Sequence, residues 1–233
     1  MTARSFYEGA RDCAPFMIIV IPFSMLFGVV AREAGLDILQ TVSMAVLVIA
    51  GASQFTALAL LQDNAPVVVA LIGGLAVNLR MAMYSAALVP YLGHARLSTR
   101  ALMAYLMVDQ SFAVAVRAYE ERPQMTAPQR VAYYFGCMAA ICPLWYGCTF
   151  LGAVIGEALP EALSLDFAVP VCFIALLAPL LRSGPHIVAA FVSAVTALAF
   201  AWLPWKLGLV IAAPAAMVAG AQCELWLARR RAA

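Results

Sequence analysis

The sequence predicts an all-α membrane protein, a polytopic bundle of transmembrane helices, and two observations carry this prediction. Of its 233 residues, 65% are hydrophobic and only 11% are charged, whereas soluble domains contain about 25% charged residues. The hydrophobic residues also form long blocks, with most charges confined to the stretches between them. Such blocks need lipid as their solvent, because a soluble protein of this size could not cover so much apolar surface.

The limits of the membrane spans follow from helix geometry. At about 1.5 Å per residue, roughly 20 residues cross the hydrocarbon core of a bilayer. We therefore expect about eight spans in a single integral membrane domain that comprises residues 1–233. Their approximate limits are 14–31, 41–61, 66–92, 101–118, 130–156, 167–182, 185–203 and 207–228.

Two of these spans contain residues that favour an interruption. Span 41–61 has Gly51-Ala52-Ser53-Gln54 at its centre, a run that permits either close helix packing or local unwinding. Span 66–92 would be roughly 40 Å long as one helix and has a Gly-Gly pair at Gly73, so it could consist of two half-helices. A broken or re-entrant segment in this region would change the number of spans.

The distribution of basic residues predicts an orientation with both termini in the cytoplasm. Nine arginines would then lie inside and four basic residues outside, in agreement with the positive-inside rule. The inside set is Arg4, Arg11, Arg117, Arg122, Arg130, Arg182, Arg229, Arg230 and Arg231, and the outside set is Arg32, Arg96, Arg100 and Lys206. We expect the protein to reside in a bacterial inner membrane.

Several functional classes lack their sequence signatures here. The chain has neither a GxxxxGK[ST] phosphate-binding loop nor a basic stripe of the kind that binds nucleic acid. It has no Ser/His/Asp set in a water-exposed domain, so we expect neither enzymatic activity nor a cofactor. Its six cysteines lack metal-binding spacing, and we interpret Met81 and Met83 as apolar filling rather than as metal ligands.

Two charged residues, Arg80 and Asp109, lie near the centres of predicted spans. A charge at mid-bilayer costs at least about 2.5 kcal/mol, so each must face protein, a water-filled cavity or an opposite charge. Counted from their shared loop at residues 93–100, their depths differ by only roughly 5 Å. One interpretation is a binding site in which Arg80 receives a carboxylate and Asp109 an ammonium group or a proton. Its further polar members would be Asn78, Gln54, Ser53 and Gln110. The other interpretation is a structural ion pair between two helices.

The same residues resemble the motifs of a known family. The segments are Ala50-Gly51-Ala52-Ser53-Gln54-Phe55, Val77-Asn78-Leu79-Arg80 and Asp109-Gln110-Ser111-Phe112-Ala113. They are similar to the AzlC family, the large subunits of branched-chain amino-acid exporters, and the similarity continues at residues 165–170, 173–177 and 207–209. Two positions depart from the family's pattern: Met81 stands where members often carry His, and Gln110 where they often carry Glu.

The resemblance implies export of leucine, isoleucine, valine or a similar aliphatic amino acid, together with a small AzlD-type membrane subunit. Inward proton flow would then drive outward transport, with Asp109 as the proton acceptor. Phe55, Met83 and Phe112 would enclose the aliphatic side chain, and membrane lipid would surround the bundle.

Two alternatives keep the same fold. The chain could be a non-transporting membrane scaffold or sensor in which Arg80 and Asp109 form a structural pair. It could also be the permease of an ATP-driven system, although the predicted loop at residues 117–130 is short for a helix that contacts an ATPase.

Overall fold

A computed structural model of the protein describes residues 2–158, 174, 181, 183–203 and 207–232. Every regular element within these ranges is a helix and none is a strand, which confirms the predicted all-α class. The predicted span 167–182 lies almost wholly outside the described residues. The chain forms two compact units, Met1–Leu58 with Val77–Ser164 and Ala59–Ala76 with Leu165–Ala233, and each unit is described by itself.

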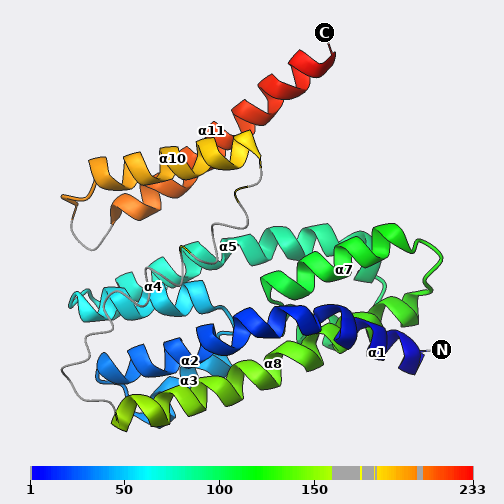
Figure 1. Ribbon diagram of the computed structural model, residues 1–233, viewed down its shortest axis with the longest axis horizontal. Coiled ribbons are helices and arrows are strands. Elements are labelled where there is room, and N and C mark those ends of the chain that lie inside the picture. The colour runs from blue at the N-terminus through cyan, green and yellow to red at the C-terminus, as the bar shows by residue number, and fades with distance from the viewer. Residues whose placement is uncertain (1, 159–173, 175–180, 182, 204–206, 233) are drawn as a thin grey trace. The chain divides into compact units, whose positions relative to one another are not determined.

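The first unit is built on two long helical segments that lie side by side (Figure 1). One consists of α1 (Thr2–Cys13), a short 3-10 turn η1 (Ala14–Phe16) and α2 (Met17–Glu33), and the other is α8 (Ala127–Ala158). A Cβ atom on Gly28 of α2 would collide with the carbonyl oxygen of Thr149, and one on Gly152 of α8 with that of Met25. These glycines therefore let the two backbones touch, as small residues commonly do between membrane helices.

The predicted span 41–61 is a broken helix. Helix α3 (Ile38–Leu47) begins at a capping box in which the Asp37 carboxylate accepts a hydrogen bond from the Gln40 N–H. It ends at Val48, whose backbone is extended (φ −134°, ψ 99°). Helix α4 (Gly51–Gln62) starts three residues later. The interruption thus falls immediately before the run of small and polar residues rather than within it.

The contacts of α4 show that this broken helix turns back on itself. Gly51 packs against Phe23 and Trp145, near the middle of α2 and α8. One turn later, the ring centroid of Phe55 lies 5.1 Å from that of Phe23 and 5.4 Å from that of Phe27. Phe27 lies nearer than Phe23 to the C-terminal end of α2, and α3 begins shortly after that end. Helix α3 and the first turns of α4 therefore form a re-entrant hairpin, the first hairpin, which enters and leaves at one end of the unit.

The predicted spans 66–92 and 101–118 both differ from expectation. Helix α5 (Val67–Leu92) is continuous, which corrects the expectation of two half-helices, and the Gly-Gly pair at Gly73 is buried within it. Residues 101–118, predicted as one span, are divided between α6 (Leu97–Tyr105) and α7 (Asp109–Glu121). Between them, Val108 is extended (φ −132°, ψ 161°).

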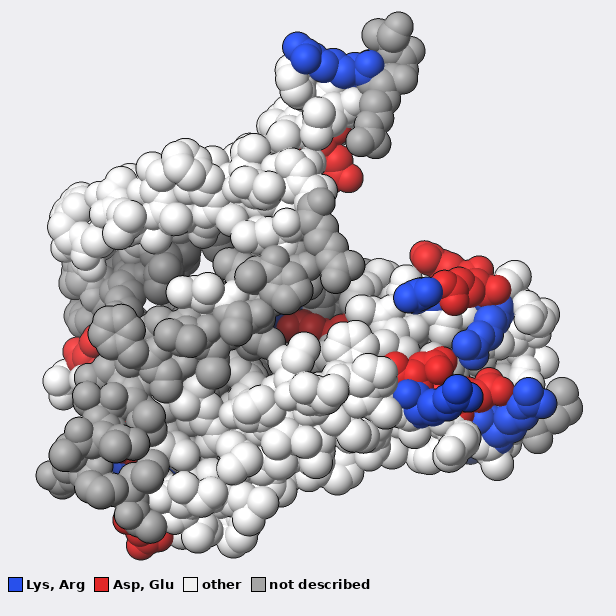
Figure 2. Space-filling model, viewed as in Figure 1, with Lys and Arg blue, Asp and Glu red and all other residues white. Residues whose placement is uncertain are grey.

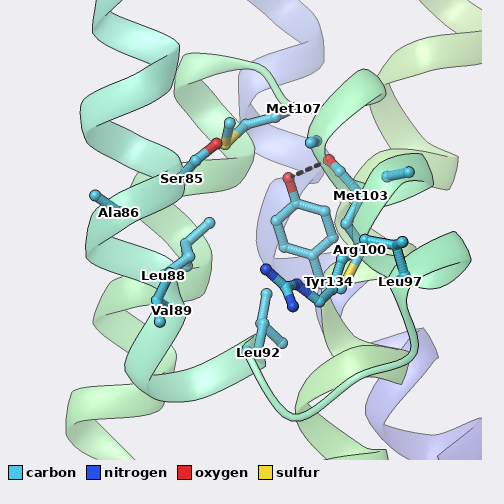
Figure 3. A pocket seen from close by; sticks show the side chains of 13 residues that line it. Ser85, Ala86, Leu88, Val89, Leu92, Leu97, Arg100, Met103, Met107 and Tyr134 are labelled. Carbon is cyan, nitrogen blue, oxygen red and sulfur yellow. Dashed lines mark hydrogen bonds between the residues drawn. The ribbon is translucent and has the colours of Figure 1, made fainter.

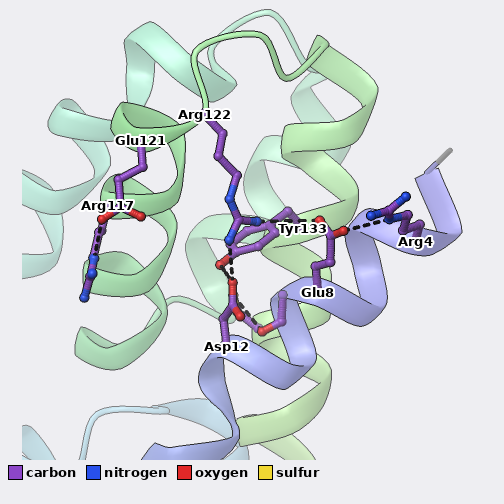
Figure 4. A network of polar contacts seen from close by, with 9 residues as sticks. Arg4, Glu8, Asp12, Arg117, Glu121, Arg122 and Tyr133 are labelled. Atoms are coloured by element: carbon purple, nitrogen blue, oxygen red, sulfur yellow. Dashed lines mark hydrogen bonds and ion pairs between the residues drawn. The ribbon is translucent and has the colours of Figure 1, made fainter.

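Helices α6 and α7 form a second hairpin, which enters from the opposite end. Three contacts join α5 to α7 in chain order: Arg80 with Asp109, Tyr84 with Phe112, and Tyr91 with Tyr119. Since α5 and α7 therefore run in the same direction, α6 must run back between them. Arg122, directly after α7, contacts Glu8 and Asp12 of α1 (Figure 4). The second hairpin thus enters and leaves at the end that holds the N-terminus.

This hairpin changes the side of the membrane predicted for two basic residues. Arg96 and Arg100 lie at the turn from α5 into α6, and hence at the same end as Arg4 and Arg11, which corrects their assignment to the opposite side. Seven arginines of the first unit now share this end: Arg4, Arg11, Arg96, Arg100, Arg117, Arg122 and Arg130. The other end has Arg32. Figure 2 shows charged side chains gathered at the end of the unit where α1 begins.

Four segments among the described residues are long and apolar enough to cross a membrane. They are Thr2–Glu33, Val67–Leu92, Ala127–Glu157 and Ile211–Arg230. The helices of the two hairpins are shorter, with 10 and 12 residues in α3 and α4 and 9 and 13 residues in α6 and α7, each close to half a bilayer in length. The chain is a multi-pass helical membrane protein.

In the second unit, α10 (Gly184–Ala199) and α11 (Leu207–Ala232) pack as an antiparallel pair. The Cβ position of Gly220 lies 3.2 Å from that of Ala189, so the two helices approach closely along their middle. Phe191 and Leu198 are exposed on α10, as expected of a helix surface in contact with lipid.

Candidate functional site

The candidate site is centred on an ion pair between α5 and α7. An Nη atom of Arg80 lies 3.0 Å from a carboxylate oxygen of Asp109, and the two side chains are 30% and 40% exposed. Arg80 stands in the middle of α5, and Asp109 is the first residue of α7, at the tip of the second hairpin. The structure therefore brings together the two charged residues that the sequence placed at similar depths.

The break before α7 positions Asp109. The Ser111 hydroxyl donates to the carbonyl oxygen of Val108 at 2.7 Å and accepts from the Val108 N–H at 3.2 Å, which fixes the extended residue. The first N–H groups of α7 have no partners within the helix, and their partial positive charge favours a carboxylate at this position. The Asp109 carboxylate thus has two electrostatic partners, the helix end and Arg80.

The ion pair leaves hydrogen-bonding capacity unused. Within the described residues, Oδ1 of Asp109, Nε of Arg80 and Oδ1 of Asn78 are buried without a hydrogen-bond partner. Buried polar atoms of native proteins are nearly always paired. A carboxylate oxygen can accept from an ammonium group, and a guanidinium N–H can donate to a carboxylate. The pair can therefore bind a ligand that carries both charges.

Two other predicted site residues lie beside the pair without binding it. Asn78 precedes Arg80 by two residues on α5, and residues two apart on a helix point to different sides. Gln110 follows Asp109 on α7 and is partly exposed. In the part of the chain that the structure describes, no hydrogen bond joins either of them to the pair.

The remaining predicted residues, Ser53 and Gln54, lie in the first turn of α4 at the tip of the first hairpin. They are buried, at 5% and 1% exposure. Gln54 shares a helix face with Gly51 and Phe55, the face that packs against α2 and α8. Both amide atoms of Gln54 lack a hydrogen-bond partner among the described residues. The structure thus places Gln54 in a separate, closely packed surrounding rather than on the ion pair.

The tips of the two hairpins are joined directly. The hydroxyl of Tyr105, the last residue of α6, donates to the carbonyl oxygen of Val46 in the last turn of α3. The same hydroxyl lies 3.4 Å from that of Tyr146 on α8. Gly51 and Asp109, which begin α4 and α7, follow within five residues of Val46 and Tyr105 along the chain. Both helix breaks therefore lie around one point near the middle of α8.

Helix α8 also holds the end of α6 in place. The Tyr134 hydroxyl donates to the carbonyl oxygen of Met103 at 3.0 Å, and the Cys142 thiol donates to that of Leu106 at 3.7 Å. Carbonyl groups at the C-terminal end of a helix lack partners within the helix. Side chains of α8 supply those partners, which allows α6 to end inside the protein.

Sequence reasoning missed the aromatic side chain beside the pair. Tyr84 stacks on Phe112, with ring centroids 4.1 Å apart and an interplanar angle of 12°. Helical spacing could have identified Tyr84, because it lies one turn after Arg80, as Phe112 lies one turn after Asp109.

The apolar residues expected around a substrate have different neighbours in the structure. Phe112 lies beside the pair, whereas Phe55 packs with Phe23 and Phe27 at the first hairpin. Met83 is 54% exposed and points away from a packed interior. The aromatic wall that the structure shows beside the pair consists of Tyr84 and Phe112.

Known proteins are similar to the region that carries these features. A family model described as AzlC protein matches residues 15–159. A curated protein named "Uncharacterized membrane protein" from Archaeoglobus fulgidus is 29% identical over 199 residues, 84% of each chain. "Inner membrane protein YgaZ" of Escherichia coli K12 is 27% identical over 181 residues, 75% of this chain and 73% of the relative. No solved structure matches the chain.

Proposed function

Because this chain belongs to the AzlC protein family, we propose that it is a secondary exporter of branched-chain or similar small hydrophobic amino acids. The observation that carries the proposal is the Arg80–Asp109 pair at the tip of a re-entrant hairpin. Broken helices at mid-bilayer depth are where many transporters bind their substrates. Ionisable residues inside a membrane are also functional by default.

An amino acid can replace each partner of the pair with a group of its own. Its carboxylate would bind the Arg80 guanidinium, and its ammonium group would bind the Asp109 carboxylate. In the structure each of these side chains still has one buried polar atom without a hydrogen-bond partner among the described residues. The substrate therefore satisfies both charges at once, which a monovalent acid or amine cannot do.

The surroundings of the pair suit an aliphatic side chain. The stacked rings of Tyr84 and Phe112 form an apolar wall directly beside the charges. Apolar contact favours larger aliphatic side chains by about 0.8 kcal/mol for each buried CH₂ group. Leucine, isoleucine and valine would therefore be preferred over alanine or glycine.

Proton entry is the proposed energy source. Asp109 is the acid at the tip of the second hairpin, where protonation would weaken its hold on the substrate's ammonium group and on Arg80. Release of the substrate would then be coupled to proton uptake by this carboxylate. The coupling rests on the position of Asp109 and on the family resemblance.

The proposal includes the cellular setting. Seven arginines at the N-terminal end of the first unit, against Arg32 at the other, favour a cytoplasmic N-terminal end. The curated relative from Escherichia coli is named an inner membrane protein, which supports the same location here, and we place the C-terminus in the cytoplasm too. A small AzlD-type membrane subunit would complete the exporter, as the family resemblance implies.

Efflux of preloaded radiolabelled leucine tests the proposal. Cells expressing the chain with its small subunit should lose leucine faster than empty cells, and Arg80→Ala should remove this difference. Arg11→Ala is the matched control, because Arg11 is exposed on α1 and makes no ion pair with the described residues. Membrane abundance of both proteins is measured in every strain. Equal efflux from wild-type and empty cells would refute the exporter function.

The scaffold alternative is separated by exchanging the two charges. The double variant R80D/D109R keeps an ion pair, so a purely structural role predicts that abundance and function survive. A zwitterion site predicts that the protein reaches the membrane but no longer exports leucine, because each charge now faces the wrong end of the substrate. Full export by the double variant would therefore contradict the proposed site.

A further inference from the structure

A cavity of about 330 Å³ lies between α5, α6 and Tyr134 of α8 (Figure 3). Its volume falls at the lower end of the range for small-molecule sites, about 300 to 1,000 Å³. All of its walls belong to the first unit. None of its lining residues is part of the Arg80–Asp109 site, so the cavity is a separate feature of the protein.

The cavity leads from the N-terminal end of the unit toward the ion pair. Its outer end is lined by Gly93 and Leu97, at the turn between α5 and α6, and its inner end by Ser85 and Met107. Ser85 lies five residues after Arg80 on α5, a rise of about 7.5 Å. Met107 precedes Asp109 by two residues. A solute that fills the cavity therefore stops one to two helical turns short of the pair.

The lining is mostly apolar and includes one charged side chain. Leu88, Leu92 and Met103 are among the residues that form its walls, and Arg100 is the charged member. Figure 3 shows the guanidinium group of Arg100 reaching into the space between Leu92 and Tyr134. The Tyr134 hydroxyl is already engaged with the Met103 carbonyl at 3.0 Å, so its ring serves as wall. A cavity with apolar walls and one cationic side chain can bind an aliphatic molecule that carries a carboxylate.

Three other arginines at this end are paired, whereas Arg100 has no ion-pair partner among the described residues. Arg4 and Arg117 each pair with a glutamate one turn away, at 2.9 and 2.7 Å. Arg122 contacts Asp12 at 3.3 Å (Figure 4). The Arg100 side chain makes neither an ion pair nor a hydrogen bond with the residues that the structure describes. Its charge is therefore available to an anion that enters the cavity.

We propose that this cavity is a loading site, in which an aliphatic amino acid from the N-terminal side binds through its carboxylate to Arg100 before it moves to Arg80. The proposal rests on the proposed export function and adds a second binding position to it. The aliphatic side chain would lie against Leu88, Leu92 and Met103. Movement inward then exchanges one guanidinium partner for another, so the carboxylate need not enter the membrane unpaired.

Protection of an introduced cysteine tests binding in the cavity. Ala101 lines it, and Ala3 is exposed on α1 at the same end. In membrane vesicles of each orientation, a membrane-impermeant maleimide should label Ala101→Cys and Ala3→Cys from the same side. Leucine should slow labelling of Ala101→Cys only. The protein without either substitution gives the background from native cysteines. Labelling of the two positions from opposite sides, or no protection by leucine, would overturn the loading site.

Substitution of Arg100 separates this site from the export function itself. In the Ala101→Cys background, Arg100→Gln should raise the leucine concentration for half-protection by about tenfold, because a charge-assisted hydrogen bond is lost. Arg100→Lys should restore most of the protection, and Arg96→Gln should leave it unchanged. In otherwise wild-type protein, Arg100→Gln should raise the KM for export from the N-terminal side and leave kcat similar. Normal export with an unchanged KM in Arg100→Gln would refute the loading site while the exporter function stands. Absence of export by the wild-type protein would refute the exporter function and the loading site together.

Discussion

The two hairpins approach the middle of α8 from opposite ends, yet only one of them carries charge. Helix α7 begins with Asp109 bound to Arg80 at 3.0 Å, and the adjoining α6 lines an open cavity. Helix α4 (Gly51–Gln62) contains no charged residue, and its first turn packs against rings of α2 and α8. The difference suits two distinct roles in the proposed exporter: the second hairpin would bind the charges of the substrate and admit it, and the first would provide a closely packed wall.

The largest expected effect comes from removing charge from the second hairpin. Asp109→Asn leaves Arg80 without its partner, and truncating one member of such a pair costs about 2 to 5 kcal/mol. We expect leucine efflux to fall by about 30-fold or more. Glu121→Gln is the control, because its exposed pair with Arg117 should contribute little. Full-rate export against a gradient by Asp109→Asn would show that Asp109 is not the proton acceptor.

Bulk added to the first hairpin should act on stability instead. A Cβ atom on Gly51 would lie 2.8 Å from the ring of Trp145 and closer still to Phe23, and overpacking typically costs about 1 to 3 kcal/mol. Gly51→Val should lower the melting temperature of the detergent-purified protein. Gly147→Val is the matched control, because no atom lies within 4 Å of its Cβ position. Equal melting temperatures would mean that the first hairpin is not closely packed.

Gln54 tests whether the first hairpin also contributes a polar group. An unpartnered buried amide costs about 1 to 3 kcal/mol, so Gln54→Leu should keep or raise the melting temperature. Export should nevertheless fall severalfold if the amide binds substrate during transport. A lower melting temperature would show instead that the amide has a structural partner, and unchanged export would remove Gln54 from the site.

The smallest effect is expected where the hairpins meet. Tyr105→Phe removes the hydrogen bond to the Val46 carbonyl, a loss of about 1 kcal/mol. The balance between joined and separated tips should shift about fivefold, which we expect to appear as a changed export rate at equal abundance. Tyr7→Phe, on an exposed α1 residue, should have no effect. Identical rates in both variants would show that this contact does not regulate the hairpins.

The sequence predicts the helical membrane class and the nearness of Arg80 and Asp109, because both depend on depth alone. The position of a residue within a hydrophobic block indicates its depth in the membrane but not the direction in which the chain runs there. A hairpin that returns to its own side has the same composition as a span. Residues 101–118 therefore appeared as one crossing, although the placement of Arg96 and Arg100 against the positive-inside rule already suggested otherwise.

The helix breaks were hard to locate because their residues are ordinary apolar ones. Val48 and Val108 are extended, yet neither break contains proline or glycine between its helices. Contacts made elsewhere in the chain stabilise them, including those of Tyr134 and Cys142 with carbonyl groups near the end of α6. Conversely, the Gly-Gly pair at Gly73 lies within a continuous helix. Local composition therefore suggested the wrong break.

The most direct measurement of the central proposal is competition for leucine export by two analogues that each lack one charge. Isocaproate keeps the carboxylate and the aliphatic chain, and isoamylamine keeps the ammonium group and the chain. If Arg80 and Asp109 together bind both ends of the substrate, excess unlabelled leucine should block efflux of labelled leucine, and neither analogue should do so at the same concentration. Inhibition by either analogue as strong as that by leucine would contradict a site that requires both charges.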